Sequence, residues 1–225
     1  MKIAVVSGGT KGIGKEITKA FLEAGMKVYI SARSKDESFE HKNLVQYAAD
    51  MSSKSDVQQF AEFIQKNENQ VDILVNNVGV FIPGKLMEEE DGIYETQINT
   101  NLSSTYYLTR NLISSIRKSS SAYIFNICST ASITPYMNGG SYCISKYAQL
   151  GFTKVLREEL KNENIRVSAV LPGATLTNSW AGTDLPAERF LDPASVAQLI
   201  LTASQMPQNL VMEEILVRPM EGDLS

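Results

Sequence analysis

Tyr142 and Lys146 stand four residues apart in the segment SYCISKYAQLGF, a spacing that places both side chains on one face of a helix. A phenol has an ordinary pKa of about 10, which is too high for ready proton exchange at neutral pH. A neighbouring ammonium group favours the phenolate and lowers that pKa. The pair therefore predicts a proton donor, although an amphipathic helix with an exposed Tyr and Lys has the same spacing.

The segment SGGTKGIGKEITKA contains two phosphate-binding patterns at once. Read from Gly9 it is G-x-x-x-x-G-K, the start of a P-loop, and read from Gly8 it is G-x-x-x-G-x-G, a turn typical of dinucleotide sites. A P-loop needs Ser or Thr after its lysine, because that hydroxyl binds magnesium. Here Glu16 follows Lys15, and we expect its carboxylate to lie near the phosphates and repel them. The dinucleotide interpretation is favoured over a P-loop phosphotransferase.

The same segment fits the geometry of a dinucleotide turn. We expect a strand to end at Ser7, Gly8 to turn the chain, and Gly12 and Gly14 to let a pyrophosphate approach the start of a helix. An ordinary glycine turn before a helix looks similar, so the pattern needs support from the rest of the chain. The expected cofactor contacts in this turn are Gly8, Thr10, Lys11, Gly12, Ile13 and Gly14.

The end of the next predicted strand, SARS, indicates which dinucleotide is bound. An NAD site has an acidic residue here, about 20 residues past the glycines, for the ribose 2′-hydroxyl. In this chain Ala32 takes that place, and Arg33 supplies a planar cation suited to a 2′-phosphate. Lys11 adds a second positive charge within the glycine turn. Two cations flanking the expected phosphate favour NADP(H).

The elements that must position these residues alternate along the chain. Apolar runs without polar alternation are separated by segments of helical period, which indicates a parallel sheet covered on both faces, with its ligand at the carboxyl ends of the strands. We expect residues 1–225 to form one doubly wound α/β domain. The predicted strands are 2–6, 27–32, 44–49, 71–77, 121–128, 165–172 and 213–219, and two long helices are predicted at 91–118 and 141–162.

The motifs SGGTKGIG, NNVG, NICS, YCISK and LPGATLT, in that order, resemble the short-chain dehydrogenase/reductase family along nearly the whole chain. The resemblance implies a Rossmann fold whose seven-stranded sheet has the order 3-2-1-4-5-6-7. It also implies an NADPH-dependent enzyme that reduces a ketone or aldehyde, or runs the reverse reaction, on a small-molecule substrate. Homodimers or homotetramers are expected, paired through helices near 100–117 and 141–160 that carry outer apolar positions such as Tyr106, Tyr107, Leu108 and Phe152.

The same resemblance assigns the catalytic roles. Ser129 lies thirteen residues before Tyr142, which is the family's spacing between its catalytic Ser and Tyr, and Asn101 matches the family's catalytic Asn. By resemblance Tyr142 is the general acid, Ser129 hydrogen-bonds the carbonyl oxygen, Lys146 binds the nicotinamide ribose and lowers the pKa of Tyr142, and Asn101 holds a water in a proton relay. Further cofactor contacts carried over are Asp50, Met51, Asn77, Gly79, Gly173, Thr175 and Thr177.

Several questions stay open on the sequence. A catalytically silent NADP(H)-binding sensor or scaffold is the alternative to an enzyme, and the intact set of four catalytic residues argues against it. The substrate is not fixed, although the ending EEILVRPMEGDLS is closer to relatives that act on small carbonyls or hydroxy acids. We expect a short substrate lid at about 178–192 that carries Trp180, the only tryptophan, with burial in the core as the alternative.

Other classes of function find little support. The net charge of -4 gives no electrostatic reason to expect nucleic acid or an acidic membrane surface, and no segment approaches the ~20 apolar residues of a membrane span. His41 is the single histidine, so neither a Ser-His-Asp triad nor a zinc site is expected. Two cysteines, Cys128 and Cys143, make no disulfide framework. The first strand begins too early for a signal peptide, and we expect a cytoplasmic protein.

Overall fold

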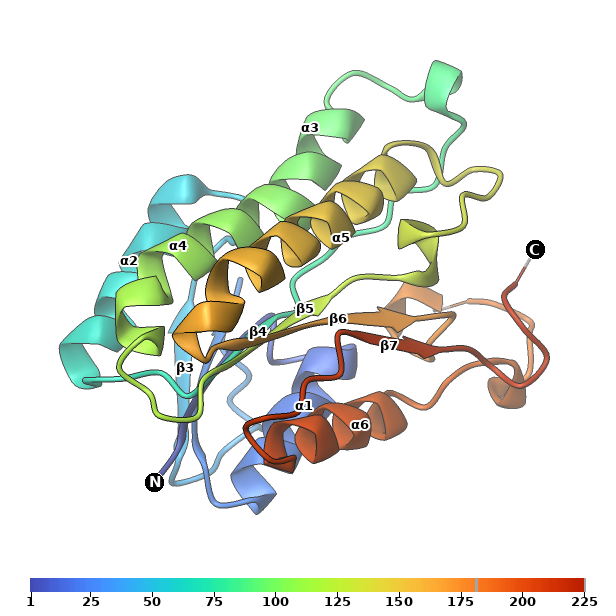
Figure 1. Cartoon of the computed structure of the whole chain (residues 1–225). Coiled ribbons are helices and arrows are strands. Elements are labelled where there is room, and N and C mark those ends of the chain that lie inside the picture. The colour runs from blue at the N-terminus through green and yellow to red at the C-terminus, as the bar shows by residue number, and fades with distance from the viewer. Residues whose placement is uncertain (181, 225) are drawn as a thin grey trace.

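The computed structural model describes residues 1–180 and 182–224, and one parallel sheet runs through it (Figure 1). Its order, β3-β2-β1-β4-β5-β6-β7, confirms the predicted topology. The strands are β1 (Ile3–Ser7), β2 (Lys27–Ala32), β3 (Leu44–Ala48), β4 (Ile73–Asn76), β5 (Tyr123–Ile127), β6 (Arg166–Pro172) and β7 (Glu214–Val217). All six neighbouring pairs are parallel, so the carboxyl ends of the strands meet along one edge.

Helices cover both faces of this sheet (Figure 1). On one face lie α1 (Gly12–Glu23) and α6 (Pro193–Gln205), which pack against each other. On the other lie α2 (Lys54–Asn67), α4 (Ser104–Ile116) and α5 (Gly140–Leu160), with the short α3 (Ile93–Ile98) against α5. The α6 helix begins with Asp192, whose carboxylate accepts a hydrogen bond from the backbone of Ala194, as its Asp-Pro start predicts.

Alternate residues of each central strand feed two separate apolar cores, which explains why the strands lack polar alternation. In β1, Ile3 and Val5 face the core under α2, α4 and α5, whereas Ala4 and Val6 face the core over α1 and α6. All four are buried. Because both faces are covered, the strand is stable only with apolar side chains on each, and the run KIAVV meets that need.

One predicted helix is interrupted. The stretch 91–118 was expected to be continuous, but the structure has α3, then one turn of π-helix at Asn99–Ser103, then α4. A π turn inserts one residue into the helical repeat and is frequently found at functional sites. Its middle residue, Asn101, is fully buried and turns its amide toward a neighbouring loop rather than toward the next helical turn. The periodicity of residues 91–118 does not predict this contact, because its partner, Val80, lies outside that segment.

Candidate active site

A cavity of about 1050 Å³ lies at the carboxyl ends of the strands and gathers nearly all the predicted site residues. A smaller cavity of about 500 Å³, around Phe39 and His41 in the loop before β3, contains none of them. Among the predicted residues, only Gly14 and Asn101 do not line the large cavity. Those that do are Gly8, Thr10, Lys11, Gly12, Ile13, Arg33, Asp50, Met51, Asn77, Gly79, Ser129, Tyr142, Lys146, Gly173, Thr175 and Thr177.

The glycine turn between β1 and α1 has the backbone that its sequence requires. Gly8 and Gly12 have φ values of +69° and +51°, in the left-handed region that favours glycine. A Cβ on Gly14 would overlap the carbonyl oxygen of Gly8, so this glycine serves close packing of turn and helix rather than ligand contact. The side chain of the N-cap residue Lys11 accepts no hydrogen bond from the first turn of α1. The first N–H groups of this helix are therefore available to an anion.

Polar contacts fasten this turn to the neighbouring strand end. The hydroxyl of Ser7 accepts hydrogen bonds from the backbone nitrogens of Asn77 (2.9 Å) and Val78 (3.1 Å). The Asn77 amide donates to the carbonyl oxygens of Ser7 (3.0 Å) and Gly8 (3.1 Å). The Ser7 hydroxyl therefore joins the end of β1 to the segment after β4, and Asn77 holds the turn as well as lining the cavity.

Two cations stand at the end of the cavity formed by the glycine turn and β2. Lys11 and Arg33 are exposed and line it, and within residues 1–180 and 182–224 neither makes an ion pair. Asp50 lies nearby: hydrogen bonds from the backbone and hydroxyl of Ser52, with the charge of Arg33, lower the pKa of its carboxyl. This end can therefore receive an anion without first breaking an internal ion pair.

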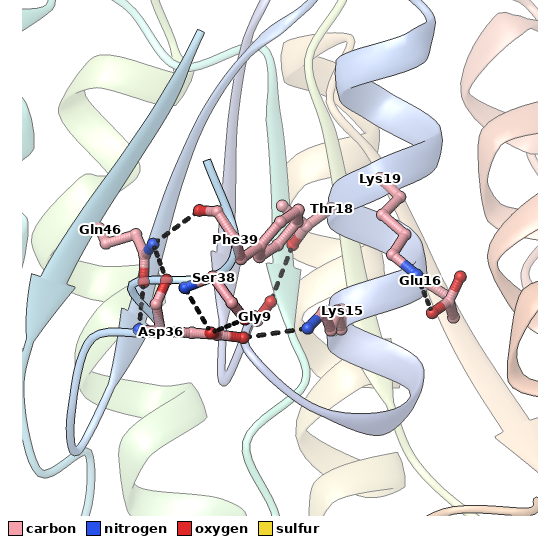
Figure 2. Close-up of polar contacts among 9 residues, drawn as sticks. All are labelled: Gly9, Lys15, Glu16, Thr18, Lys19, Asp36, Ser38, Phe39 and Gln46. Atoms are coloured by element: carbon pink, nitrogen blue, oxygen red, sulfur yellow. Dashed lines mark hydrogen bonds and ion pairs between the residues drawn. The ribbon is translucent and has the colours of Figure 1, made fainter. Parts of the chain in front are cut away.

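The expectation for Glu16 is wrong. Figure 2 shows its carboxylate turned along α1 toward Lys19, 2.8 Å away, and it does not line the cavity. Lys15 is also directed elsewhere, because its ammonium contacts Asp36 at 2.9 Å (Figure 2). The P-loop interpretation still fails, because no Ser or Thr hydroxyl follows Lys15. In addition, Lys15 pairs with Asp36 and so joins α1 to the loop between β2 and β3.

Ser129, Tyr142 and Lys146 come together at the other end of the cavity. Ser129 follows β5, and its hydroxyl accepts a hydrogen bond from the backbone of Ala131 (3.1 Å), so it caps its own loop while facing the cavity. Tyr142 and Lys146 share one face of α5, and the Lys146 ammonium lies 5.9 Å from the centre of the tyrosine ring. That ammonium donates to the carbonyl of Ile127 and to Gln149 Oε1, both at 2.9 Å.

Residues 2–186 match the family model described as short chain dehydrogenase. The chain belongs to the short-chain dehydrogenase family. Its relatives include a sepiapterin reductase from Chlorobaculum tepidum, 30% identical over 99% of this chain and 98% of the relative, and an uncharacterized oxidoreductase from Staphylococcus saprophyticus, 29% identical over 97% of both chains.

Solved structures share the whole fold. An alcohol dehydrogenase from the archaeon Thermococcus sibiricus, complexed with 5-hydroxy-NADP, superposes with a TM-score of 0.90 at 23% identity and covers 100% of this chain and 99% of its own. A metagenomic short-chain oxidoreductase in complex with NADP gives 0.84 at 26% identity, over 97% of each chain.

The protonation of the Tyr–Lys pair in this short-chain dehydrogenase differs from our expectation. Burial raises the pKa of Tyr142 to about 12, against a smaller opposing effect of its hydrogen bond with Ser129. Burial also lowers the pKa of Lys146 to about 8. The predicted lowering of the phenol pKa is therefore wrong here, because the cost of burying a phenolate exceeds any help from an ammonium that faces Ile127 and Gln149 instead.

Asn101 lies behind the cavity wall. Its amide donates to Val80 O (3.0 Å) and to Ser145 Oγ (2.8 Å), and its carbonyl oxygen accepts from Val80 N (2.7 Å). All of its side-chain groups are thus engaged with protein. Through these contacts the Asn101 side chain joins the π turn, the segment after β4 and α5, and its role in a proton relay stays a prediction.

Some cavity residues were missed by sequence reasoning. The rings of Phe81 and Tyr142 are 4.9 Å apart, those of Phe81 and Tyr136 are 6.3 Å apart, and all three line the cavity. Phe81 and Tyr136 come from irregular loops, where no periodicity marks a residue as facing a site. Gln149, the partner of Lys146, was detectable in principle, because it lies three residues further along the same helix.

Trp180 lies on the cavity, as a lid residue should, and is half-buried rather than part of a core. Its ring packs on Phe190, with 5.0 Å between ring centres. The ends of the predicted lid are joined where Leu176 N donates to Leu191 O (2.9 Å) and Leu191 N donates to Ala174 O (2.8 Å). Of the predicted 178–192 segment, residue 181 lies outside the described residues.

Within residues 1–180 and 182–224, no helix combines the length and the apolar character that crossing a bilayer requires. No group of three or more His, Cys, Asp or Glu side chains there is arranged to hold a metal ion.

Proposed function

We propose that this short-chain dehydrogenase is an NADP(H)-dependent enzyme that reduces a ketone or aldehyde to an alcohol, with Tyr142 as general acid. One observation carries the proposal: Ser129, Tyr142 and Lys146 line the same cavity as the glycine turn and Arg33. A cavity of about 1050 Å³ that offers an anion site at one end and a half-buried phenol at the other suits a large cofactor and a small substrate together.

The residues present fit NADP(H). The uncapped N-terminus of α1 and the close-packed glycine turn would hold the pyrophosphate, and Lys11 and Arg33 would bind the 2′-phosphate. Gly79, Gly173, Thr175 and Thr177 would line the nicotinamide end. When bound, the cofactor supplies the hydride. The NADP complexes among the structural neighbours support this choice.

The protein's own groups would supply orientation and a proton. Ser129 hydrogen-bonds the carbonyl oxygen of the substrate and Tyr142 donates its phenolic proton to that oxygen as negative charge develops there. With a pKa of about 12, the phenol is protonated throughout the neutral range, so its proton is present for reduction. The Lys146 ammonium, 5.9 Å from the ring centre, lines the same cavity and would hold the nicotinamide ribose.

The walls near Tyr142 favour a small uncharged carbonyl compound over a hydroxy acid. They are formed by the rings of Phe81 and Tyr136, which offer flat apolar surface, and Trp180 lines the same cavity. Lys146 is the single cation at this end among the described lining residues; Ile127 and Gln149 use two of its three N–H donors, and the third would bind the nicotinamide ribose. A carboxylate substrate would therefore find no free cationic partner there. The relative named sepiapterin reductase makes sepiapterin one compound to test.

Tyr142→Phe is the deciding experiment. The substitution removes one hydroxyl and keeps the ring against Phe81, so the fold and NADPH binding should survive. General acid catalysis is typically worth 10²–10⁴-fold, and we expect turnover to fall by about that factor. A panel of small ketones, aldehydes and sepiapterin, followed by NADPH absorbance, supplies the substrate, and binding of NADPH is titrated separately.

Tyr147→Phe is the matched control, because Tyr147 is 43% exposed on the same helix and should keep wild-type turnover. Ser129→Ala should lower turnover while leaving NADPH affinity near wild type. Wild-type turnover by Tyr142→Phe would refute the mechanism. NADPH binding without turnover of any carbonyl by the wild type would favour the sensor or scaffold alternative.

A further inference from the structure

The first turn of α5 is capped by a residue from a distant part of the chain. Its N-cap residue, Gly139, has no side chain to accept from the helical N–H groups, and no acidic residue stands in that turn. Instead, Glu89 Oε1 accepts a hydrogen bond from the backbone nitrogen of Ser141 at 2.7 Å, and Glu89 Oε2 accepts one from the Ser141 hydroxyl. Glu89 follows a short 3-10 turn, Leu86–Glu88, 52 residues earlier in the sequence.

Glycines make room for this carboxylate. A Cβ on Gly140 would overlap Glu89 Oε1, and a Cβ on Gly84 would lie 3.1 Å from Glu89 Cγ. The backbone of Gly84 also donates to Asn138 O at 3.0 Å and forms an isolated parallel bridge with Gly139. The segment 84–89 and the start of α5 are therefore fitted closely to each other, with the Glu89 carboxylate between them.

Both joined segments carry side chains of the active site. Ser141 is 1% exposed and immediately precedes Tyr142. Glu89 therefore holds the residue next to the one that carries the phenol. The other segment continues back to Phe81, whose ring packs edge-on against Tyr142 with 4.9 Å between ring centres. A single carboxylate thus ties the loop that forms one wall of the cavity to the helical turn that carries the proton donor.

We propose that Glu89 is a positioning residue for Tyr142: its two hydrogen bonds to Ser141 hold the first turn of α5 and the 81–89 loop in the arrangement that reduction needs. The inference rests on the proposed function, because it assigns the reaction to Tyr142. A carboxylate suits the task, since it accepts both hydrogen bonds and is favoured beside the positive end of the helix dipole. Glu89 does not line the cavity, so it acts through Ser141.

Three variants separate positioning from general stability. Glu89→Ala removes both hydrogen bonds. Glu89→Gln keeps an oxygen that accepts from Ser141 N, and its amide group can donate to the Ser141 hydroxyl. Glu88→Ala is the matched control, because Glu88 is the neighbouring carboxylate, is highly exposed and makes an ion pair with the exposed Lys85. For each, kcat and KM for the best carbonyl of the panel, KM for NADPH and the melting temperature are measured well below that temperature.

Glu89→Ala should lower kcat about tenfold to hundredfold, which is the effect expected when a reacting group is displaced by about 1 Å. KM for NADPH should stay within about twofold, because the cofactor end is built from the glycine turn and Arg33. Glu89→Gln should recover kcat to within about threefold of wild type, and Glu88→Ala should match wild type. Hydrogen exchange should become faster at amides 140–143 in Glu89→Ala and stay unchanged at amides 150–158.

The outcomes distinguish this inference from the proposed function. Wild-type kcat in Glu89→Ala, or a Gln variant as slow as the Ala variant, would overturn the positioning role while Tyr142→Phe still tests the mechanism. Exchange at amides 140–143 that is unaffected by Glu89→Ala would overturn it even if no carbonyl substrate were found. If Tyr142→Phe turns over at the wild-type rate, the proposed function fails, whatever Glu89 does.

Discussion

Lys146 is a cation buried to 4% exposure, and within residues 1–180 and 182–224 no carboxylate pairs with it, which is costly in a folded chain. Its ammonium is satisfied by the Ile127 carbonyl and by Gln149, both neutral groups. Burial accordingly lowers its pKa to about 8. The buried charge of Lys146 lowers the stability of the fold, and it lies beside the candidate proton donor. Residues that reduce stability in this way are found mainly at functional sites, which supports a functional role for Lys146.

Lys146→Met should therefore stabilise the protein while abolishing turnover. A pKa lowered from 10.5 to about 8 corresponds to a cost of roughly 3 kcal/mol at neutral pH, and loss of two hydrogen bonds at about 1 kcal/mol each offsets much of the gain. We expect the melting temperature to rise by a few degrees at pH 7. Because the folded pKa lies below the unfolded one, wild-type stability rises between about pH 8 and 10.5, and the advantage of the variant should shrink there. Thermal unfolding of both proteins between pH 7 and 10.5 tests the higher melting temperature of the variant and the decrease of that difference with pH. A variant less stable than wild type at pH 7 would contradict the prediction.

Arg33 decides the cofactor preference at the residue scale. It lines the cavity from the end of β2, and Lys11 stands in the facing glycine turn. A charge-assisted contact to the 2′-phosphate is worth roughly 1.5–3 kcal/mol, so NADPH should bind about tenfold to hundredfold tighter than NADH. Arg33→Ala should remove most of that difference and leave NADH affinity unchanged. Titration of both cofactors measures it, and equal wild-type affinities would refute it.

At the scale of elements, the predicted lid between β6 and α6 is joined at its base by backbone contacts. Thr175 and Leu191 form an isolated bridge at the base, whereas Trp180 is half-buried and rests on Phe190. Lids of this kind close over ligands in many enzymes. We propose the same for residues 178–192, because Trp180 already faces the cavity.

Closure should be visible in the intrinsic fluorescence, since Trp180 is the only tryptophan. Adding NADP⁺ together with a carbonyl ligand should exclude water from the indole and change the emission wavelength and intensity. Trp180→Phe should remove the signal without changing the fold, which makes it the control. Emission unmoved at saturating cofactor and ligand would show that Trp180 keeps its packing on Phe190 and that this segment is not a lid.

Elements were more predictable than the contacts between them. The run KIAVV and the Tyr142–Lys146 spacing depend on local periodicity, and the structure has both a buried β1 and a shared α5 face. The direction of Glu16, the π turn at Asn101 and the Phe81 wall depend on neighbours that are distant in sequence, so no local pattern reveals them. The pKa of Tyr142 was missed for the same reason: its burial is a property of the whole cavity.

At the scale of the whole molecule, the outer face of α4 and α5 offers apolar surface. Tyr106, Ile144, Tyr147 and Val155 are 38%, 42%, 43% and 57% exposed. The rings of Tyr106 and Phe152 pack together, with 5.9 Å between their centres, and join the two helices. Leu108, which was expected on this outer face, instead lies fully buried in the core against the sheet. The single-domain organisation of 1–225 remains a prediction, and the α4–α5 face is where we propose that two copies meet.

Light scattering at micromolar concentration should give two or four times the mass of one chain, because an exposed apolar face of this kind is stabilised by a symmetric partner. Val155→Asp should shift the protein toward the single-chain mass, since a carboxylate cannot be buried in such an interface without a partner. Leu199→Asp is the matched control: Leu199 is 40% exposed on α6, on the opposite face of the sheet, and should leave the mass unchanged. A wild-type mass equal to that of one chain would rule out the dimer, and an unchanged mass in Val155→Asp alone would place the interface elsewhere.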